Sequence, residues 1–226
     1  MARFIAIEGL IGVGKTTLCR LLAQERGATL ILEPNEHNPF LGPFYADPER
    51  YAFSAQMFYL YQRWKQQQRI RQLDLFDQLV VSDYVFAKDR IFAEKTLSDE
   101  ELELYDRFAG TLAEQGPRPD LLVFLSSPLD VIMARIAERQ AVGEGAIKLD
   151  YLIDLQDRYD VLLANWHQCP VLRLSNRELN YRDDPDARDI VLRRIDAALT
   201  GNVASQQPPG SQVDREGTLD MFSAKL

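Results

Sequence analysis

Short apolar runs alternate with longer amphipathic segments over the first 200 residues of the chain. Each run is too short for a helix and is apolar at nearly every position, which is typical of a strand buried on both faces. The runs are Phe4–Ile7, Ala28–Leu32, Leu79–Val81, Leu121–Leu125 and Val171–Leu174. Strands that alternate with helices predict an α/β protein with a five-stranded parallel sheet, doubly wound, with helices on both faces.

Between these runs, hydrophobic residues recur at helical spacing. The predicted helices begin near Lys15 and then cover Pro48–Leu73, Ser98–Leu112, Ser127–Arg139, Leu152–Trp166 and Asp186–Leu199. Ser98 and Glu101 have the spacing of a capping box. Ser127, followed by Pro128, is predicted to cap the helix that ends near Arg139.

The longest predicted helix changes character along its length. Tyr51–Trp64 is apolar nearly all round, which predicts burial on several sides, whereas Lys65–Gln72 is polar and is expected to face solvent. The segment before this helix, Asn35–Pro48, contains three prolines and one glycine, so we expect it to be a loop. Beyond Gly201 hydrophobic residues are scarce, which is typical of disorder. The chain therefore reads as one domain over residues 1–200 with a tail over residues 201–226.

A glycine-rich loop lies between the first predicted strand and the first predicted helix. Residues 9–16 read GLIGVGKT and match the pattern G-x-x-x-x-G-K-[ST]. Glycines let backbone N–H groups surround phosphate oxygens, and the following helix directs its positive end at the same anion. In this pattern the lysine reaches the β- and γ-phosphates and the threonine hydroxyl binds Mg²⁺. We therefore expect a nucleoside triphosphate to bind Gly9, Gly12, Gly14, Lys15, Thr16 and Thr17, with Mg²⁺ on Thr16.

Composition excludes several other classes of protein. The net charge of −8 argues against a nucleic-acid-binding surface, which would need a basic stripe. Two cysteines make no disulfide framework and two histidines make no metal cluster; Cys19 is expected to be a small core residue. No apolar run is long enough to span a bilayer and no signal-peptide pattern is present, so we expect a cytoplasmic location without membrane contact.

Five ordered signatures resemble the deoxyribonucleoside kinases, the family that includes deoxycytidine, deoxyguanosine and deoxyadenosine kinases. They are residues 8–18 (EGLIGVGKTTL), Glu33-Pro34, residues 44–63, Asp83 with residues 88–93 (KDRIFA), and residues 135–152. The resemblance covers about residues 3–175. It implies a P-loop kinase that uses ATP and Mg²⁺ to phosphorylate the 5′-hydroxyl of a deoxynucleoside, with a lid near residues 139–148. It also implies a homodimer.

The resemblance assigns two carboxylates to the reaction. Asp83 matches the catalytic base, which also lies near the metal, and Glu33 matches a second carboxylate next to the 5′-hydroxyl and the metal. The alternatives are a helix cap for Asp83 and a surface turn for Glu33. Tyr84 stands where the family has an arginine that places positive charge beside the acceptor. Arg90 is the nearest cationic candidate to replace it.

A second group of residues matches the positions that recognise the base. Gln56 and Arg63 are seven residues apart and lie on one face of the long helix, and both align with base-reading residues of the family. Asp89 aligns with the aspartate that accompanies this arginine in members that prefer purines or cytosine. The alternative is an internal Arg63–Asp89 ion pair without a ligand. We expect deoxyadenosine, deoxyguanosine or deoxycytidine to be preferred over thymidine.

The remaining matches concern the sugar and the lid. Tyr45 and Glu144 align with residues that hold the 3′-hydroxyl. Arg135 and Arg139, four residues apart on one helix, would neutralise the migrating phosphate at the lid entrance. The alternative for these arginines is a solvated face that also carries Glu138. Three aromatic residues are candidates for stacking on the base, although plain core positions are equally expected: Phe53, Phe86 and Phe92.

Two other classes of protein, thymidylate kinases and GTPase switches, fit the sequence less well. Thymidylate kinase shares the glycine loop and the Glu-Pro turn but normally has Asp-Arg after the third strand, where this chain has Asp83-Tyr84. A GTPase switch would need a base-reading N-K-x-D motif, which is absent.

Two surfaces predict partners beyond the substrate. Phe53–Trp64 has more apolar surface than one sheet face can cover, which favours contact with a second copy of the chain. In the tail, Gly217–Phe222 is an apolar island that resembles the short leucine–aspartate–phenylalanine peptides bound by bacterial sliding clamps. The alternative is a loose end that packs on the domain.

Overall fold

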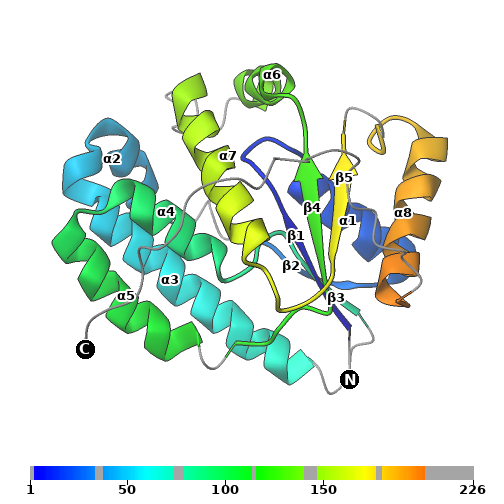
Figure 1. The fold of residues 1–226 in the computed structure, drawn as a ribbon, viewed down its shortest axis with the longest axis horizontal. Coiled ribbons are helices and arrows are strands. Elements are labelled where there is room, and N and C mark those ends of the chain that lie inside the picture. The colour runs from blue at the N-terminus through cyan, green and yellow to red at the C-terminus, as the bar shows by residue number, and fades with distance from the viewer. Residues whose placement is uncertain are drawn as a thin grey trace, which may run out of the picture.

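A five-stranded parallel sheet forms the centre of the molecule (Figure 1). Its strands are β1 (Arg3–Glu8), β2 (Thr29–Ile31), β3 (Leu79–Ser82), β4 (Leu121–Ser126) and β5 (Val171–Ser175), in the order β2-β3-β1-β4-β5. The computed structural model describes residues 3–33, 38–73, 79–113, 116–139, 147–176 and 180–201. The predicted fold class is confirmed, and each strand coincides with one of the predicted apolar runs.

The register of the sheet brings distant residues to one edge. Ile5 in β1 lies opposite Val81 on one side and Leu121 on the other, and all three are almost fully buried. Because the strands run in the same direction, their C-terminal ends meet. Glu8 ends β1, Asp83 directly follows β3, and both lie at this shared edge.

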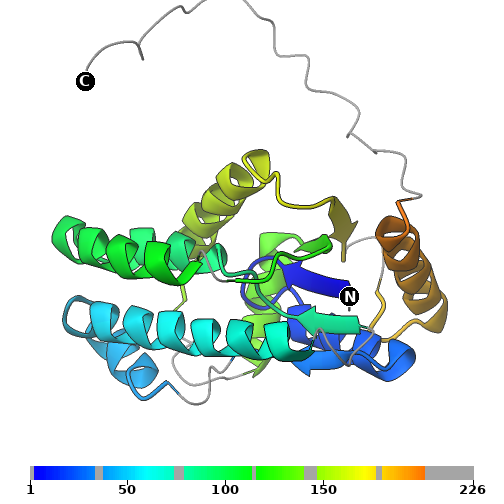
Figure 2. The same ribbon diagram turned by 90° about the horizontal axis from the view of Figure 1, so that it is seen from below.

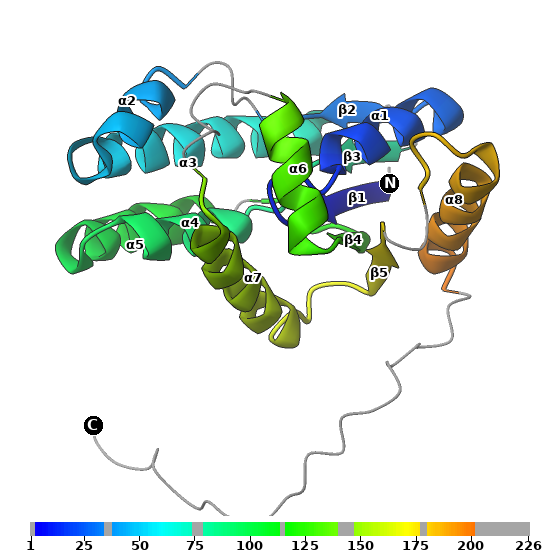
Figure 3. The same cartoon turned by 90° about the horizontal axis from the view of Figure 1, so that it is seen from above.

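The described residues form eight helices around the sheet. They are α1 (Lys15–Arg26), α2 (Leu41–Ala46), α3 (Pro48–Leu73), α4 (Lys88–Thr96), α5 (Asp99–Ala113), α6 (Leu129–Arg139), α7 (Leu149–Ala164) and α8 (Pro185–Leu199). Figures 2 and 3 show α1 and α7 on opposite faces of the sheet and α2 to α5 gathered at one end. The Arg26–Asp196 ion pair joins α1 to α8. Helix α6 lies above the edge toward which the strands point (Figure 1).

Two of these helices were missing from the predicted elements. Helix α2 lies within Asn35–Pro48, which we expected to be a loop. Its Pro43 lies in the first turn, where a backbone N–H has no helical partner, so proline does not break this helix. Helix α4 buries Lys88 and Asp89 beside its apolar positions, and buried charges hide the amphipathic pattern from which a helix is predicted.

Two local predictions about α3 and α6 were also wrong. The polar half of α3 is not wholly solvated, because Gln67 is buried and Gln66 Nε2 donates a hydrogen bond to the Leu32 carbonyl at 2.7 Å. The Ser127 hydroxyl is buried without a hydrogen-bond partner among the described residues, so it does not cap α6. By contrast, Ser98 and Glu101 form the predicted capping box through reciprocal bonds of 3.1 and 3.3 Å.

Two further findings concern the core and the helix lengths. Cys19 is fully buried in the main core, as predicted. In the part of the chain that the structure describes, no helix is long and apolar enough to cross a membrane.

Candidate active site

The loop between β1 and α1 has the backbone of a phosphate cradle. Gly9, Gly12 and Gly14 have φ values of 142°, 80° and 108°, which residues with a side chain rarely adopt. A Cβ atom at Gly9 would lie 2.3 Å from the Leu125 carbonyl oxygen. Helix α1 begins at Lys15, directly after the loop, so its first N–H groups face any anion that the loop holds. The geometry fits the triphosphate that the sequence predicts.

Lys15 is held against the same loop. Its Nζ atom donates hydrogen bonds to the carbonyl oxygens of Gly9 and Leu10 at 2.7 and 3.0 Å. Burial, together with repulsion from Lys88, lowers the pKa of Lys15 from 10.5 to about 8. A bound anion would favour the charged form and raise this pKa again. The ammonium group is therefore placed to meet a phosphate.

Asp83 links the glycine loop to the end of β2. Thr16 Oγ1 donates a hydrogen bond to Asp83 Oδ2 at 2.6 Å, and the backbone N–H of Glu33 donates to Oδ1 at 2.8 Å. Helix α4 begins only at Lys88 and has no side-chain cap, so Asp83 does not cap this helix. A hydroxyl beside carboxylate oxygens supplies the ligands that Mg²⁺ prefers, so Thr16 and Asp83 fit the predicted metal site.

Glu33 lies at the centre of a buried charged cluster. Lys88 Nζ contacts its Oε2 at 2.9 Å, and the Arg63 guanidinium contacts its Oε1, with Nε at 3.1 Å. Burial alone would raise the pKa of Glu33, but Lys88 and Arg63 hold it well below its usual range. Glu33 is therefore a charged group in the site and not a surface turn residue.

The three predicted base-reading residues lie on the facing helices α3 and α4. Arg63 forms a buried ion pair with Asp89, which also accepts a hydrogen bond from the Tyr105 hydroxyl at 2.8 Å. Gln56 Nε2 donates to Thr96 Oγ1 at 3.1 Å, while its Oε1 is buried with no partner among the described residues. A buried acceptor without a donor is costly, so Gln56 Oε1 is available to a ligand N–H group.

Tyr84 does not place a positive charge in the site, and Arg90 does not supply the charge of the arginine that the family has at position 84. The Tyr84 hydroxyl donates to Gln66 Oε1 at 2.5 Å, and its ring lies 5.6 Å from the Arg63 guanidinium. Arg90 is exposed on the outer side of α4 and pairs with Asp106 and Glu94. The prediction for Arg90 is wrong because residues 88 and 90 point in different directions on a helix. Lys88, two residues before Arg90 on α4, is buried instead and contacts Glu33.

The predicted lid residues are only partly within the described residues. Arg135 in α6 donates to the Val13 carbonyl of the glycine loop at 3.2 Å, so it lies beside the loop, and its role at the phosphate stays a prediction. Arg139 is exposed at the end of α6, near enough to Tyr45 in α2 to act on the pKa of that phenol, which burial raises. Glu144 and residues 140–146 of the predicted lid lie outside the described residues. The aromatic residues Phe53, Phe86 and Phe92 are half-buried, so their role stays a prediction.

Glu8 ties three elements together behind the glycine loop. Its carboxylate accepts hydrogen bonds from the backbone N–H groups of Gly9 and Val85 at 3.1 and 2.9 Å, and from the Tyr159 hydroxyl at 2.8 Å. Burial raises the pKa of Tyr159 well above its usual range, and Glu8 raises it further, so Tyr159 stays a hydrogen-bond donor. These contacts fix the loop relative to β3 and α7.

The sequence analysis missed three residues that contact the site. Lys88 contacts Glu33, Asn176 Nδ2 donates to the Val13 carbonyl, and the Tyr181 hydroxyl donates to the Gly14 carbonyl at 3.3 Å. Asn176 directly follows β5 at the edge where ligands bind in such sheets, so its position was a usable signal. Tyr181 lies farther along a loop and only the tertiary structure brings it to Gly14.

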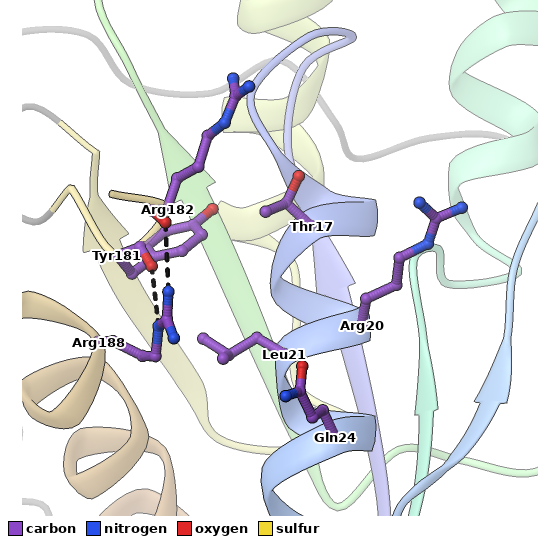
Figure 4. A pocket seen from close by; sticks show the side chains of 7 residues that line it. All are labelled: Thr17, Arg20, Leu21, Gln24, Tyr181, Arg182 and Arg188. Carbon is purple, nitrogen blue, oxygen red and sulfur yellow. Dashed lines mark hydrogen bonds between the residues drawn. The ribbon is translucent and has the colours of Figure 1, made fainter. Parts of the chain in front are cut away.

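A cavity of about 190 Å³ opens beside the glycine loop (Figure 4). It is lined by Thr17, Arg20, Leu21 and Gln24 from α1 and by Tyr181, Arg182 and Arg188. Arg188 holds the opposite wall in place, because its guanidinium donates to the carbonyl oxygens of Tyr181 and Arg182 at 3.4 and 3.3 Å. The cavity combines a flat phenol ring with several guanidinium groups.

Comparison with known proteins gives the same assignment from independent data. The family model for deoxynucleoside kinase matches residues 5–200. The chain is 36% identical over 197 residues to the deoxyguanosine kinase of Bacillus subtilis, covering 86% of this chain and 92% of that protein. It is 30% identical over 203 residues to the deoxyadenosine/deoxycytidine kinase of the same bacterium, covering 88% and 94%.

The solved structures agree on the fold. The deoxyadenosine kinase of M. mycoides with bound dCTP superposes with a TM-score of 0.73 at 21% identity, over 86% of this chain and 99% of that one. At this level of identity the likeness shows the fold alone.

Proposed function

The chain belongs to the deoxynucleoside kinase family, and on this premise we propose how its site transfers the γ-phosphoryl group of ATP to the 5′-hydroxyl of a deoxyribonucleoside. The Thr16–Asp83 hydrogen bond carries the proposal, because it joins the loop that would hold the donor to the carboxylate that would activate the acceptor. The product is the 5′-monophosphate, as in nucleotide salvage. The family assignment also sets the thymidylate kinase alternative aside.

The glycine loop and α1 supply the donor site. Backbone N–H groups at Gly12 and Gly14 would surround the β- and γ-phosphates, and Lys15 would exchange its contacts with loop carbonyls for phosphate oxygens. Thr16 and Asp83 are the residues that would hold Mg²⁺, which when bound neutralises phosphate charge. The cavity beside Thr17 lies on the outer side of this loop, and its phenol ring and guanidinium groups suit the sugar and base of the donor.

Asp83 acts as the general base. Its carboxylate takes the proton of the 5′-hydroxyl as the new oxygen–phosphorus bond forms and the bond to the β–γ bridging oxygen breaks, releasing ADP. Glu33, held charged by Lys88 and Arg63, positions the hydroxyl next to Asp83. Arg135, fixed to the loop through Val13, and Arg139 would neutralise charge on the migrating phosphoryl group.

Gln56, Arg63 and Asp89 would recognise the base. An exocyclic amine can donate to Asp89 or to the unpartnered Gln56 Oε1, while ring acceptors take the Arg63 guanidinium. Thymine lacks this amine and would leave the buried acceptors unpaired. Tyr45 and Glu144 are proposed to hold the 3′-hydroxyl. The site therefore favours deoxyadenosine, deoxyguanosine and deoxycytidine over thymidine, with a slight preference for purines.

We also propose that the protein is a cytoplasmic homodimer. Tyr61 on α3 and Leu104 and Phe108 on α5 are each about half exposed, which leaves an apolar surface across two helices that contact each other. A second copy of the chain would cover this surface. The kinase domain spans residues 1–200, and residues 217–222 of the tail remain a candidate docking peptide for a partner such as a sliding clamp.

A turnover assay tests the proposal directly. ATP-dependent phosphorylation is measured with the four deoxynucleosides and with thymidine monophosphate as acceptors, with and without Mg²⁺. We expect turnover with one or more of deoxyadenosine, deoxyguanosine and deoxycytidine, a lower kcat/KM for thymidine and none for the monophosphate. Thymidine as the best acceptor would overturn the base assignment, and turnover of the monophosphate alone would overturn the acceptor class.

A further inference from the structure

Lys88 is a buried lysine that the catalytic scheme above uses only to hold Glu33. It lies at the first position of α4 and is about 3% exposed. Its Nζ atom lies 2.9 Å from Glu33 Oε2 and 5.4 Å from the centre of the Phe92 ring. Burying an ammonium group is costly, and Glu33 offsets part of the cost. Glu33 is shared with Arg63, so Lys88 does not have this carboxylate to itself.

A chain of three contacts connects Lys88 to Thr16 at the glycine loop. Glu33 is one hydrogen bond from Asp83 through its backbone N–H, and Asp83 is one hydrogen bond from Thr16 in the glycine loop. Lys88 therefore belongs to the same buried cluster as the proposed base Asp83, whereas Lys15 contacts the loop that would hold the donor.

A buried ammonium group beside the acceptor carboxylates suits the negative charge that develops in phosphoryl transfer. Tyr84 turns its hydroxyl to Gln66 and Arg90 faces away from the site, so neither supplies a cation on the acceptor side. Among the described residues of α4, Lys88 is the cation that contacts Glu33, which in turn is hydrogen-bonded to Asp83.

We propose that Lys88 is a catalytic residue whose ammonium group stabilises the phosphoryl group in transit between donor and acceptor. In the free protein Glu33 holds the ammonium group in place. During transfer Lys88 contacts an equatorial oxygen of the migrating phosphoryl group from the acceptor side, while Lys15 contacts it from the donor side. This inference rests on the proposed kinase function.

Three substitutions separate this role from a structural one. Lys88→Gln keeps a donor for Glu33 but removes the charge, Lys88→Arg keeps the charge, and Lys88→Met removes both. We expect kcat to fall on the order of 10²–10³-fold in Lys88→Gln, the usual loss for one transition-state donor, with the KM for the deoxynucleoside changed less than about threefold. The kcat of Lys88→Arg should be at least about tenfold higher than that of Lys88→Gln.

Lys95→Met is the matched control. Lys95 lies on the same helix and forms a 2.8 Å ion pair with Asp154, but it is partly exposed and remote from Glu33. We expect its kcat to equal that of the wild type. Thermal unfolding of every variant shows whether it is folded, and all assays are run well below the lowest melting temperature.

A binding measurement without turnover completes the test. ADP, fluoroaluminate and the deoxynucleoside together mimic the phosphoryl group in transit, whereas the deoxynucleoside alone reports ground-state binding. In Lys88→Gln, the affinity for ADP, fluoroaluminate and the deoxynucleoside together should fall by the same factor as kcat. The affinity for the deoxynucleoside alone should not change.

The possible outcomes are distinct. A folded Lys88→Gln variant with wild-type kcat would overturn the proposal, as would equal weakening of both complexes. If Lys88→Gln is unfolded at the assay temperature, a Lys88→Arg variant with no more activity than Lys88→Met overturns it as well. A wild-type protein that phosphorylates no deoxynucleoside would instead overturn the proposed function.

Discussion

The hydroxyl of Thr16 donates a 2.6 Å hydrogen bond to Asp83, although 67 positions separate the two residues in the chain. Thr16 lies in the first turn of α1, directly after the glycine loop, and Asp83 directly follows β3. Their contact places a group that would bind the metal and phosphate against a group that would activate the acceptor. Several consequences of this arrangement can be measured.

Replacement of Asp83 by asparagine tests the general base. The change keeps the size of the side chain and one acceptor for Thr16 and Glu33 but removes the basic charge. We expect kcat to fall on the order of 10²–10⁴-fold with a much smaller change in the KM for the deoxynucleoside. Steady-state kinetics with ATP check this, with thermal unfolding as the control. Turnover at the wild-type rate would move the base to Glu33.

The Arg63→Met/Asp89→Ala double variant tests base recognition. Both side chains are removed together because loss of one would leave the other buried and unpaired. Arg63 also contacts Glu33, so we expect a lower kcat for every substrate. The informative quantity is the ratio of kcat/KM for each deoxynucleoside to that for thymidine, which should shift toward thymidine. An unchanged ratio would place base recognition elsewhere.

The charged carboxylate of Glu33 stabilises the folded protein, and protonation at low pH removes this stabilisation. Burial alone would raise its pKa, but Lys88 and Arg63 hold the folded-state pKa well below the usual 4.5. A carboxylate whose pKa is lower in the folded state contributes stability above its unfolded pKa, and this contribution is lost as the pH falls through the folded pKa. We expect Glu33→Gln to lower the free energy of unfolding at neutral pH.

The difference in free energy of unfolding between Glu33→Gln and the wild type should become smaller as the pH drops below about 4.5. Urea unfolding at a series of pH values measures it. Glu103→Gln is the control, because Glu103 forms an exposed ion pair with Arg107 and should show no such trend. A difference independent of pH would contradict the assigned charge on Glu33.

Light scattering at micromolar concentration tests the homodimer. We expect the mass of two chains for the wild type and of one chain for Leu104→Glu/Phe108→Glu, since charge on the exposed face of α5 would oppose its burial. Val161→Glu is the matched control, because Val161 is 64% exposed and belongs to α7, which is not one of the two helices of the proposed interface. A wild-type protein with the mass of one chain would reject the interface.

Deletion of residues 201–226 tests the tail. The kinase domain is proposed to end near residue 200, so turnover and melting temperature should stay near their full-length values. A large loss of either would mean that the tail belongs to the folded domain. Loss of binding to a purified sliding clamp, with activity intact, would support a docking role for residues 217–222.

Local sequence was sufficient for the features that neighbouring residues decide. Gly9, Gly12 and Gly14 next to Lys15 predicted the phosphate loop because the backbone conformation and the anion site are built from consecutive residues. The apolar runs predicted the strands, because a strand buried on both faces in a parallel sheet cannot contain many polar positions. The capping box at Ser98 and Glu101 is local in the same sense.

Only the tertiary structure decided which distant groups face one another. Strand order and register bring Asp83 to Thr16, and the direction of each side chain on α4 puts Lys88 in the site and Arg90 outside it. Sequence separation carries no information about these contacts, because they depend on how whole elements pack. The sequence analysis therefore selected Arg90 although Lys88 lies closer to Tyr84 in the chain. The buried charges of Lys88, Glu33 and Arg63 are stable only because folding places them together.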